Sequence, residues 1–280
     1  MINPLNPPNL RAGALVLLAL LPAAALAGPS STASMPGAEV QLLAGAVAGG
    51  VLEAGIEIRL APGWKTYWRY PGDSGVPPTL AWTGSQNVAG VEMAWPSPKR
   101  FSDGAGGFSI GYKGSVLFPL TVRLAEPGRP ARLVVSFDFA VCEKLCMPAK
   151  ADLALDIAPE GGADGARILA GRASVPEPRA FGAADSPSVQ KVEIDTAATP
   201  PRLVVEVRAQ NPKADLFAEG PDDRWALPLP QKTALPDGGA RFLIPLDGVP
   251  SGVSPAGARL LLTLVDGPKA VATEVTIPAP

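Results

Sequence analysis

The stretch RLVVSFDFAVCEKLCMPAK, residues 132–150, holds both cysteines of a 280-residue chain. In its first ten residues apolar and polar side chains alternate, which is the pattern of a half-buried antiparallel strand. Cys142 and Cys146 follow, with three residues between them. The stretch therefore predicts a β-strand that ends at a pair of closely spaced thiols.

Similar alternating runs lie on both sides of this stretch and predict further strands. Thirty glycines and thirty-three prolines fall between these short runs, where an all-β protein has its turns. We therefore expect an all-β chain with strands at 52–60, 115–124, 132–141 and 150–158, and again at 188–194, 202–209, 240–246, 258–267 and 270–278.

A change of composition divides the strands into two groups. Residues 159–187 are rich in Gly, Pro, Ala and acidic residues and contain at most one short helix, near 163–172. We interpret this segment as a linker between a β-sandwich at 38–158 and a second, smaller β-sandwich at 188–280. The second group has no cysteine and no clustered carboxylates, so a spacer or docking module is its default interpretation.

The N-terminus indicates export. The apolar run AGALVLLALLPAAALA, residues 12–27, follows Arg11 and ends in Ala25-Leu26-Ala27, the small-x-small pattern of a cleavage site. This run is shorter than the roughly 20 residues that span a bilayer. We therefore expect residues 1–27 to be a cleaved signal peptide. The mature protein should be periplasmic in a Gram-negative host, where disulfides persist.

Composition excludes several kinds of chemistry. The chain has no histidine, so a Ser-His-Asp triad, a Cys-His nucleophile pair and a His-ligated zinc or haem cannot form. No cofactor is expected. The net charge of −2, with both signs interspersed, gives no basic face, so nucleic acid is not an expected partner.

The cysteine pair is poorly placed to act as a staple. Closing a loop of about five residues contributes only about 2 kcal/mol on the chain-entropy model, against roughly 4 kcal/mol for a loop of about 60. Four residues of extended strand span about 13 Å, whereas the Cα atoms of a disulfide lie roughly 5.5 Å apart. The chain must therefore turn between Glu143 and Leu145 for the bond to close, which places both sulfurs at a strand end.

Three interpretations of the pair follow. A disulfide in a tight exposed turn is typical of a redox-exchanging pair, because exposed bonds are the labile ones. The second interpretation is an inert disulfide in a non-catalytic binding module. The third is metal binding, with Cu(I) held by Cys142, Cys146 and Met147 through sulfur. Lys144 favours a thiolate and Glu143 opposes it, so the residues alone leave open which sulfur is the nucleophile.

Three segments resemble the N-terminal periplasmic domain of the DsbD-type thiol:disulfide interchange proteins, including the copper-tolerance ScsB branch. They are GWKTYWRYPGDSGVPP (63–78), FSDGAGGFSIGYKGSVLFPLTV (101–122) and FDFAVCEKLCMPAKADL (137–153), and the resemblance covers about residues 38–158. It implies an immunoglobulin-like β-sandwich. It also implies a thiol-disulfide oxidoreductase component of the protein-disulfide reductase type.

The resemblance implies partners as well. The domain would take electrons from a thioredoxin-like periplasmic domain or protein and give them to oxidised periplasmic client proteins, for example in cytochrome c maturation or copper tolerance. Family members have a longer gap between the cysteines, and they continue into transmembrane and thioredoxin-like domains that are not expected in this chain. We therefore expect the membrane electron-transfer protein to be encoded separately.

The resemblance assigns roles to both cysteines and to one loop. Cys146 would form the mixed disulfide with the thioredoxin-like donor, with Cys142 as its internal partner. Residues 103–111, DGAGGFSIG, match the family's cap loop, a mobile flap whose ring shields the cysteines and whose glycines permit large φ/ψ changes. Phe108 is the first choice for this ring and Phe101 the second. The alternative is an ordinary hairpin with Phe108 in the core.

Trp64, Tyr67, Trp68 and Tyr70 form the densest aromatic cluster of the chain. On a strand, Trp64 and Trp68 share one face and Tyr67 lies on the other. One of these faces is expected to belong to the core. The resemblance implies that Trp64 or Tyr67 lines the redox site.

Overall fold

The computed structural model describes residues 31–73, 75–102, 106–235 and 239–279. The predicted signal peptide, residues 1–27, lies outside this part of the chain. Within the described residues, no helix is both long and apolar enough to cross a membrane. Strands make up nearly all of the regular structure there, so the expected all-β class is confirmed.

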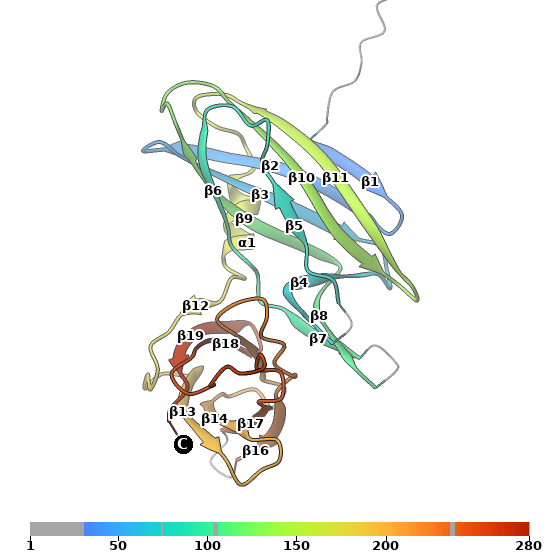
Figure 1. Ribbon diagram of the computed structural model, residues 1–280. Helices are drawn as coiled ribbons and strands as arrows, with labels where there is room; N and C mark the ends of the chain where they lie inside the picture. Colours follow the sequence, from blue (N-terminus) through green and yellow to red (C-terminus); the bar gives the residue numbers. More distant parts are fainter. Residues whose placement is uncertain (1–30, 74, 103–105, 236–238, 280) are drawn as a thin grey trace, which may run out of the picture.

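The first part of the chain is an immunoglobulin-like sandwich of two sheets, drawn from blue to yellow-green in Figure 1. One sheet has the strand order β1-β2-β3-β9-β6, and the other has the order β11-β10-β4-β8-β7, with β5 paired to β10. The strands are β1 (Thr32–Met35), β2 (Ala38–Ala48), β3 (Val51–Leu60), β4 (Lys65–Gly72), β5 (Thr79–Ala81), β6 (Val88–Met93), β7 (Lys99–Ser102), β8 (Phe108–Lys113), β9 (Ser115–Leu124), β10 (Ala131–Cys142) and β11 (Cys146–Ile157).

Strand alternation decides which residues of β10 face the core. Phe139 and Val141 belong to the main core cluster between the two sheets. The intervening residues Ala140 and Cys142 face the other way and pack together with Tyr67 in a small cluster of their own. The end of β10 therefore places its cysteine on the outer face of the sheet, away from the sandwich core.

The segment expected to be a linker is packed against both sandwiches. Helix α1 (Gly165–Arg172) falls where the composition suggested a short helix, and its Ile168 packs against Leu43 and Leu117 of the first sandwich. Strand β12 (Glu177–Pro178) pairs in parallel with β19 of the second sandwich. Residues 159–187 are thus held at two points, because an apolar helix face and a strand edge both find partners.

The second sandwich has two four-stranded sheets, with the orders β12-β19-β18-β15 and β13-β14-β17-β16. In Figure 1 it lies below the first sandwich, beside the end that carries β4, β7 and β8. Its own core includes Val205, Phe242 and Leu262. The remaining strands are β13 (Ser188–Asp195), β14 (Arg202–Arg208), β15 (Asp215–Glu219), β16 (Gln231–Ala234), β17 (Ala240–Pro245), β18 (Arg259–Asp266) and β19 (Lys269–Thr276).

Candidate redox site

The two cysteines close a β-hairpin. β10 ends at Cys142, β11 begins at Cys146, and residues 143–145 make the turn between them. The cysteines are register partners with a Cα–Cα distance of 4.1 Å, and their sulfurs form a disulfide. The chain therefore turns where the span of a disulfide requires a turn.

The two halves of the disulfide differ in exposure. Cys142 is 1% exposed and packs with Ala140 and Tyr67. Cys146 and the three turn residues are exposed, and Leu145 at the tip is 80% exposed. The exposed side of the disulfide is therefore the Cys146 residue, while Cys142 is covered by protein.

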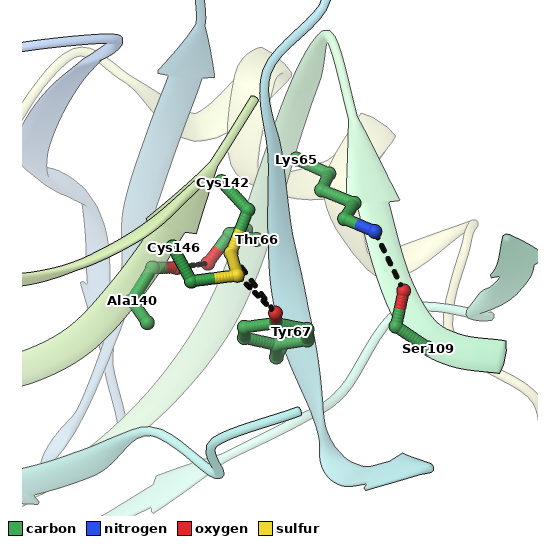
Figure 2. The surroundings of a disulfide bond; sticks show 7 residues. All are labelled: Lys65, Thr66, Tyr67, Ser109, Ala140, Cys142 and Cys146. Carbon is green, nitrogen blue, oxygen red and sulfur yellow. Dashed lines mark hydrogen bonds between the residues drawn. A yellow bond between two sulfur atoms is a disulfide. The ribbon is translucent and has the colours of Figure 1, made fainter. Parts of the chain in front are cut away.

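Tyr67 contacts both sulfurs. Its hydroxyl oxygen lies 2.9 Å from Sγ of Cys142 and 3.0 Å from Sγ of Cys146, as Figure 2 shows. Disulfide sulfurs carry no hydrogen, so the phenol O–H is the donor in these contacts. Burial raises the pKa of the Tyr67 hydroxyl above its ordinary value, so the group keeps its proton at neutral pH.

Strand β4 brings Tyr67 to the hairpin. Lys65 and Thr66 pair with the last two residues of β10, and Thr66 Oγ1 donates a 2.9 Å hydrogen bond to the carbonyl of Ala140. Lys65 Nζ donates to Ser109 Oγ at 3.0 Å, which ties β4 to β8 on its other side (Figure 2). Sequence reasoning missed these contacts because they join residues 74 and 44 positions apart, and no local pattern indicates such pairs.

The other aromatic residues expected at the site have different neighbours. Trp64 packs against the sandwich core. Phe108 is 37% exposed, and its ring centroid lies 5.6 Å from Cζ of Arg100. The ring centroid of Phe101 lies 4.6 Å from Nζ of Lys113. Each of these three rings thus has a contact of its own, with the core, with Arg100 or with Lys113.

The expected cap loop, residues 103–111, is only partly a loop. Residues 103–105 lie outside the described residues, and β8 takes up the last part of the segment in a hairpin with β7. Phe108 at the start of β8 is exposed and does not lie in the core. Gly111 is a strand residue paired with Tyr67, and a Cβ there would collide with the carbonyl oxygen of Thr66. This glycine therefore permits close approach of two strands.

Met147 lies on the other face of β11 from the exposed cysteine. It is the register partner of Val141, and both side chains pack in or against the sandwich core. Because side chains alternate along a strand, the thioether points away from Cys146. In the part of the chain that the structure describes, no three potential ligands from Cys, Asp or Glu cluster together. Neither observation favours the Cu(I) interpretation.

The disulfide lies on the outer face of a β-sandwich, with one cysteine exposed and the other covered beside a tyrosine hydroxyl. These features are those of a thiol:disulfide interchange domain. The comparison with known families agrees. The family described as "Thiol:disulfide interchange protein DsbD, N-terminal" matches residues 36–158. This segment, which includes both cysteines, is therefore similar to the N-terminal domain of these proteins.

A solved structure extends the likeness beyond this domain. The N-terminal periplasmic domain of ScsB from Proteus mirabilis is 25% identical to the chain, with a TM-score of 0.71, and the match covers 90% of this chain and 98% of that one. Because the family match ends at residue 158, a likeness over 90% of the chain also includes the second sandwich. No curated protein matches the chain.

Proposed function

We propose that the chain relays reducing equivalents in the periplasm by dithiol/disulfide exchange at Cys142 and Cys146. The donor is a thioredoxin-like domain or protein that a membrane electron-transfer domain or protein recharges, and the acceptors are oxidised periplasmic proteins. The observation that carries this proposal is the asymmetry of the disulfide. Cys146 is exposed, whereas Cys142 is buried beside the hydroxyl of Tyr67.

The chain is charged in two exchange steps. A thiolate of the donor attacks Sγ of Cys146, the disulfide breaks, and its electron pair leaves on Sγ of Cys142 as a thiolate. The second thiolate of the donor then attacks the donor sulfur of the mixed disulfide and releases Cys146 as a thiolate. The donor leaves as a disulfide and the chain as a dithiol, so two electrons have moved and solvent supplies the protons.

Tyr67 acts on the leaving sulfur in the first step. The phenol O–H already points at the disulfide, and a hydrogen bond to a thiolate is stronger than one to a neutral sulfur. Donation by Tyr67 therefore favours the charged form of Cys142 as it leaves, and a more stable leaving thiolate leaves faster. Because burial raises the pKa of Tyr67, the donor is not lost at neutral pH.

The chain is discharged by the same steps in the opposite direction. The exposed Cys146 thiolate attacks the disulfide of a client protein, and one client sulfur leaves as a thiolate. The Cys142 thiolate then attacks Sγ of Cys146, which re-forms the hairpin disulfide and releases the second client sulfur. The client is reduced by two electrons and the chain is oxidised by two.

A pair of single-cysteine variants tests this proposal. Cys142→Ser and its matched control Cys146→Ser are each converted to a mixed disulfide with thionitrobenzoate. Each is then mixed with a thioredoxin-like protein that keeps only its attacking cysteine. The adduct should form rapidly through Cys146 and slowly through Cys142, because Cys142 is 1% exposed. Mass spectrometry of the adduct identifies the linked residues.

Two results would count against the proposal. If the disulfide of the folded wild-type chain stays intact in excess reduced thioredoxin-like protein, exchange is not its function. If both single-cysteine variants form the adduct at the same rate, Cys146 is not the preferred point of attack.

A further inference from the structure

Strand β4 contacts the redox site and the second sandwich through adjacent residues. Tyr67 reaches the sulfurs, and the residues that follow it reach the second sandwich. Trp68 packs on Phe217 and Tyr70 donates a 2.6 Å hydrogen bond to the carbonyl of Leu227. In Figure 1 this end of the first sandwich faces the second one.

Phe217 lies on β15 of the second sandwich, but its side chain belongs to the core of the first sandwich. Its neighbours on β15, Leu216 and Ala218, lie in the core of the second sandwich, as strand alternation predicts for residues on one face. Phe217 faces the opposite way and is part of the main core cluster of the first sandwich. Its ring meets Trp68 edge to face with centroids 5.8 Å apart. This geometry is favourable for aromatic pairs and fixes their relative position.

Glu219 lies two residues after Phe217 on β15 and binds Arg69, the residue that follows Trp68 on β4. Its two carboxylate oxygens accept hydrogen bonds from Nε and a terminal nitrogen of Arg69 at 2.6 and 2.8 Å. Cζ of Arg69 also lies 4.5 Å from the ring centroid of Trp68. Both side chains of the pair are partly buried, and a two-point contact of this kind constrains direction as well as distance.

These contacts involve the part of β4 in which regular pairing with the neighbouring strands is interrupted. β4 pairs with β10 at only two positions, Lys65 and Thr66. On the β8 side, Tyr67 pairs with Gly111 and the next pair is Gly72 with Ser109. In the described structure the four residues 68–71 of β4 therefore lie opposite a single residue of β8. Tyr67 is thus the last regularly paired residue before the interruption. Strand β4, which presents this hydroxyl, is thus held before Tyr67 by the hairpin and after Tyr67 by the second sandwich.

From this arrangement we infer that Phe217 and Glu219 are positioning residues for the redox site. By fixing residues 68 and 69 of β4, they hold the Tyr67 hydroxyl at the two sulfurs. The second sandwich is then part of the redox machinery, since it sets how well Tyr67 stabilises the Cys142 thiolate. This inference rests on the proposed exchange function and adds the residues that tune it.

The test measures the redox equilibrium of the full chain. Wild type, Tyr67→Phe, Glu219→Ala and the double variant Tyr67→Phe/Glu219→Ala are equilibrated in glutathione buffers, and the fraction of reduced chain gives the equilibrium constant. Loss of a hydrogen bond to a charged sulfur should change this constant by about tenfold in Tyr67→Phe. Glu219→Ala should change it in the same direction by a smaller factor. In the double variant, Glu219→Ala should have no further effect.

Two more variants keep this test specific. Glu206→Ala is the matched control, because it removes the carboxylate of the Arg241–Glu206 pair on another strand of the second sandwich and should leave the constant unchanged. Phe217→Leu keeps an apolar side chain at the interface and should act like Glu219→Ala, while circular dichroism reports whether each variant is folded.

The outcomes separate this inference from the function on which it rests. If the wild-type disulfide does not exchange at all, the proposed function fails. If exchange proceeds and Tyr67→Phe alters the constant, but Glu219→Ala and Phe217→Leu do not, positioning by the second sandwich is wrong. Full additivity of Glu219→Ala with Tyr67→Phe would equally overturn it, because the effect would not pass through Tyr67.

Discussion

The hydroxyl of Tyr67 lies 2.9 Å from Sγ of Cys142, although 75 positions separate the two residues in the chain. Their contact joins two strands of one sheet, and it links the buried half of the disulfide to the strand that also meets the second sandwich. The disulfide thus has a polar neighbour that a search of its immediate sequence would not find.

Removing the Tyr67 hydroxyl should raise the thiol pKa of Cys142 in the reduced chain. The phenol O–H would donate a hydrogen bond to the thiolate and favour it, so Tyr67→Phe should shift this pKa upward. Ultraviolet absorbance of the thiolate, followed against pH in the Cys146→Ser background, measures the shift. An unchanged pKa would show that Tyr67 does not act on this sulfur.

Local sequence was sufficient for the first strand of the hairpin and for the turn that its disulfide requires. The period of two predicted β10, and the span of a disulfide predicted the turn between Glu143 and Leu145. Which strand lies beside β10 depends on pairing between distant segments, so the choice between Trp64 and Tyr67 could not be made from alternation alone. Phe217 is the clearest limit of sequence reasoning. Its pattern is that of any strand residue, and only the docking of two sandwiches places it in the other core.

Substitution of Gly111 should disturb the site through the backbone. A Cβ at this position would collide with the carbonyl oxygen of Thr66, so Gly111→Ala forces β8 and β4 apart next to Tyr67. We expect a loss of stability of about 2 kcal/mol or more, together with a change in the redox equilibrium of the disulfide in the same direction as Tyr67→Phe. Chemical denaturation and glutathione titration measure the two effects.

Gly165→Ala is the control for this substitution. A Cβ at Gly165 meets no atom within 4 Å, and the position lies at the start of α1. Alanine there should leave stability unchanged or raise it slightly, because alanine is the better helix former. Equal effects of the two substitutions would contradict the close-approach role of Gly111.

Tyrosine ionisation should destabilise the chain in alkali. Burial raises the pKa of Tyr67 and of Tyr112, and burial together with the charges of Asp73 and Glu219 raises that of Tyr70 to about 12. In the unfolded chain the pKa of tyrosine is about 10. Because the folded values are higher, the stabilising contribution is complete below about pH 10 and is lost as the pH rises through the folded values.

The free energy of unfolding should therefore fall as the pH rises from about 10 to about 12, as measured by denaturant titration at a series of pH values. Tyr70→Phe should give a shallower dependence, because one of the titrating groups is gone. Lysines titrate in the same range in both proteins, so the comparison is between the two slopes. Identical slopes would show that Tyr70 is not among the groups responsible.

A second ion pair between the sandwiches should contribute to the stability of the whole chain. Nε and a terminal nitrogen of Arg100 donate to the carboxylate of Asp215 at 3.0 and 2.7 Å, and Arg100 also donates to the carbonyl of Pro230 at 3.1 Å. Both side chains are mostly covered, so Asp215→Ala leaves a partly buried guanidinium without its charge partner. We expect a loss of about 1–3 kcal/mol in the free energy of unfolding.

The matched control for Asp215→Ala is Glu92→Ala. Glu92 pairs with Arg123 at 2.6 Å, but both side chains are more than half exposed, so its removal should cost less than about 1 kcal/mol. Urea unfolding followed by tryptophan fluorescence compares the two variants with wild type. Because Trp225 and Trp68 lie in different sandwiches, a weakened interface should also make the unfolding of the two sandwiches less cooperative than in the wild type. Equal stability of Asp215→Ala and Glu92→Ala would mean that this ion pair does not hold the sandwiches together.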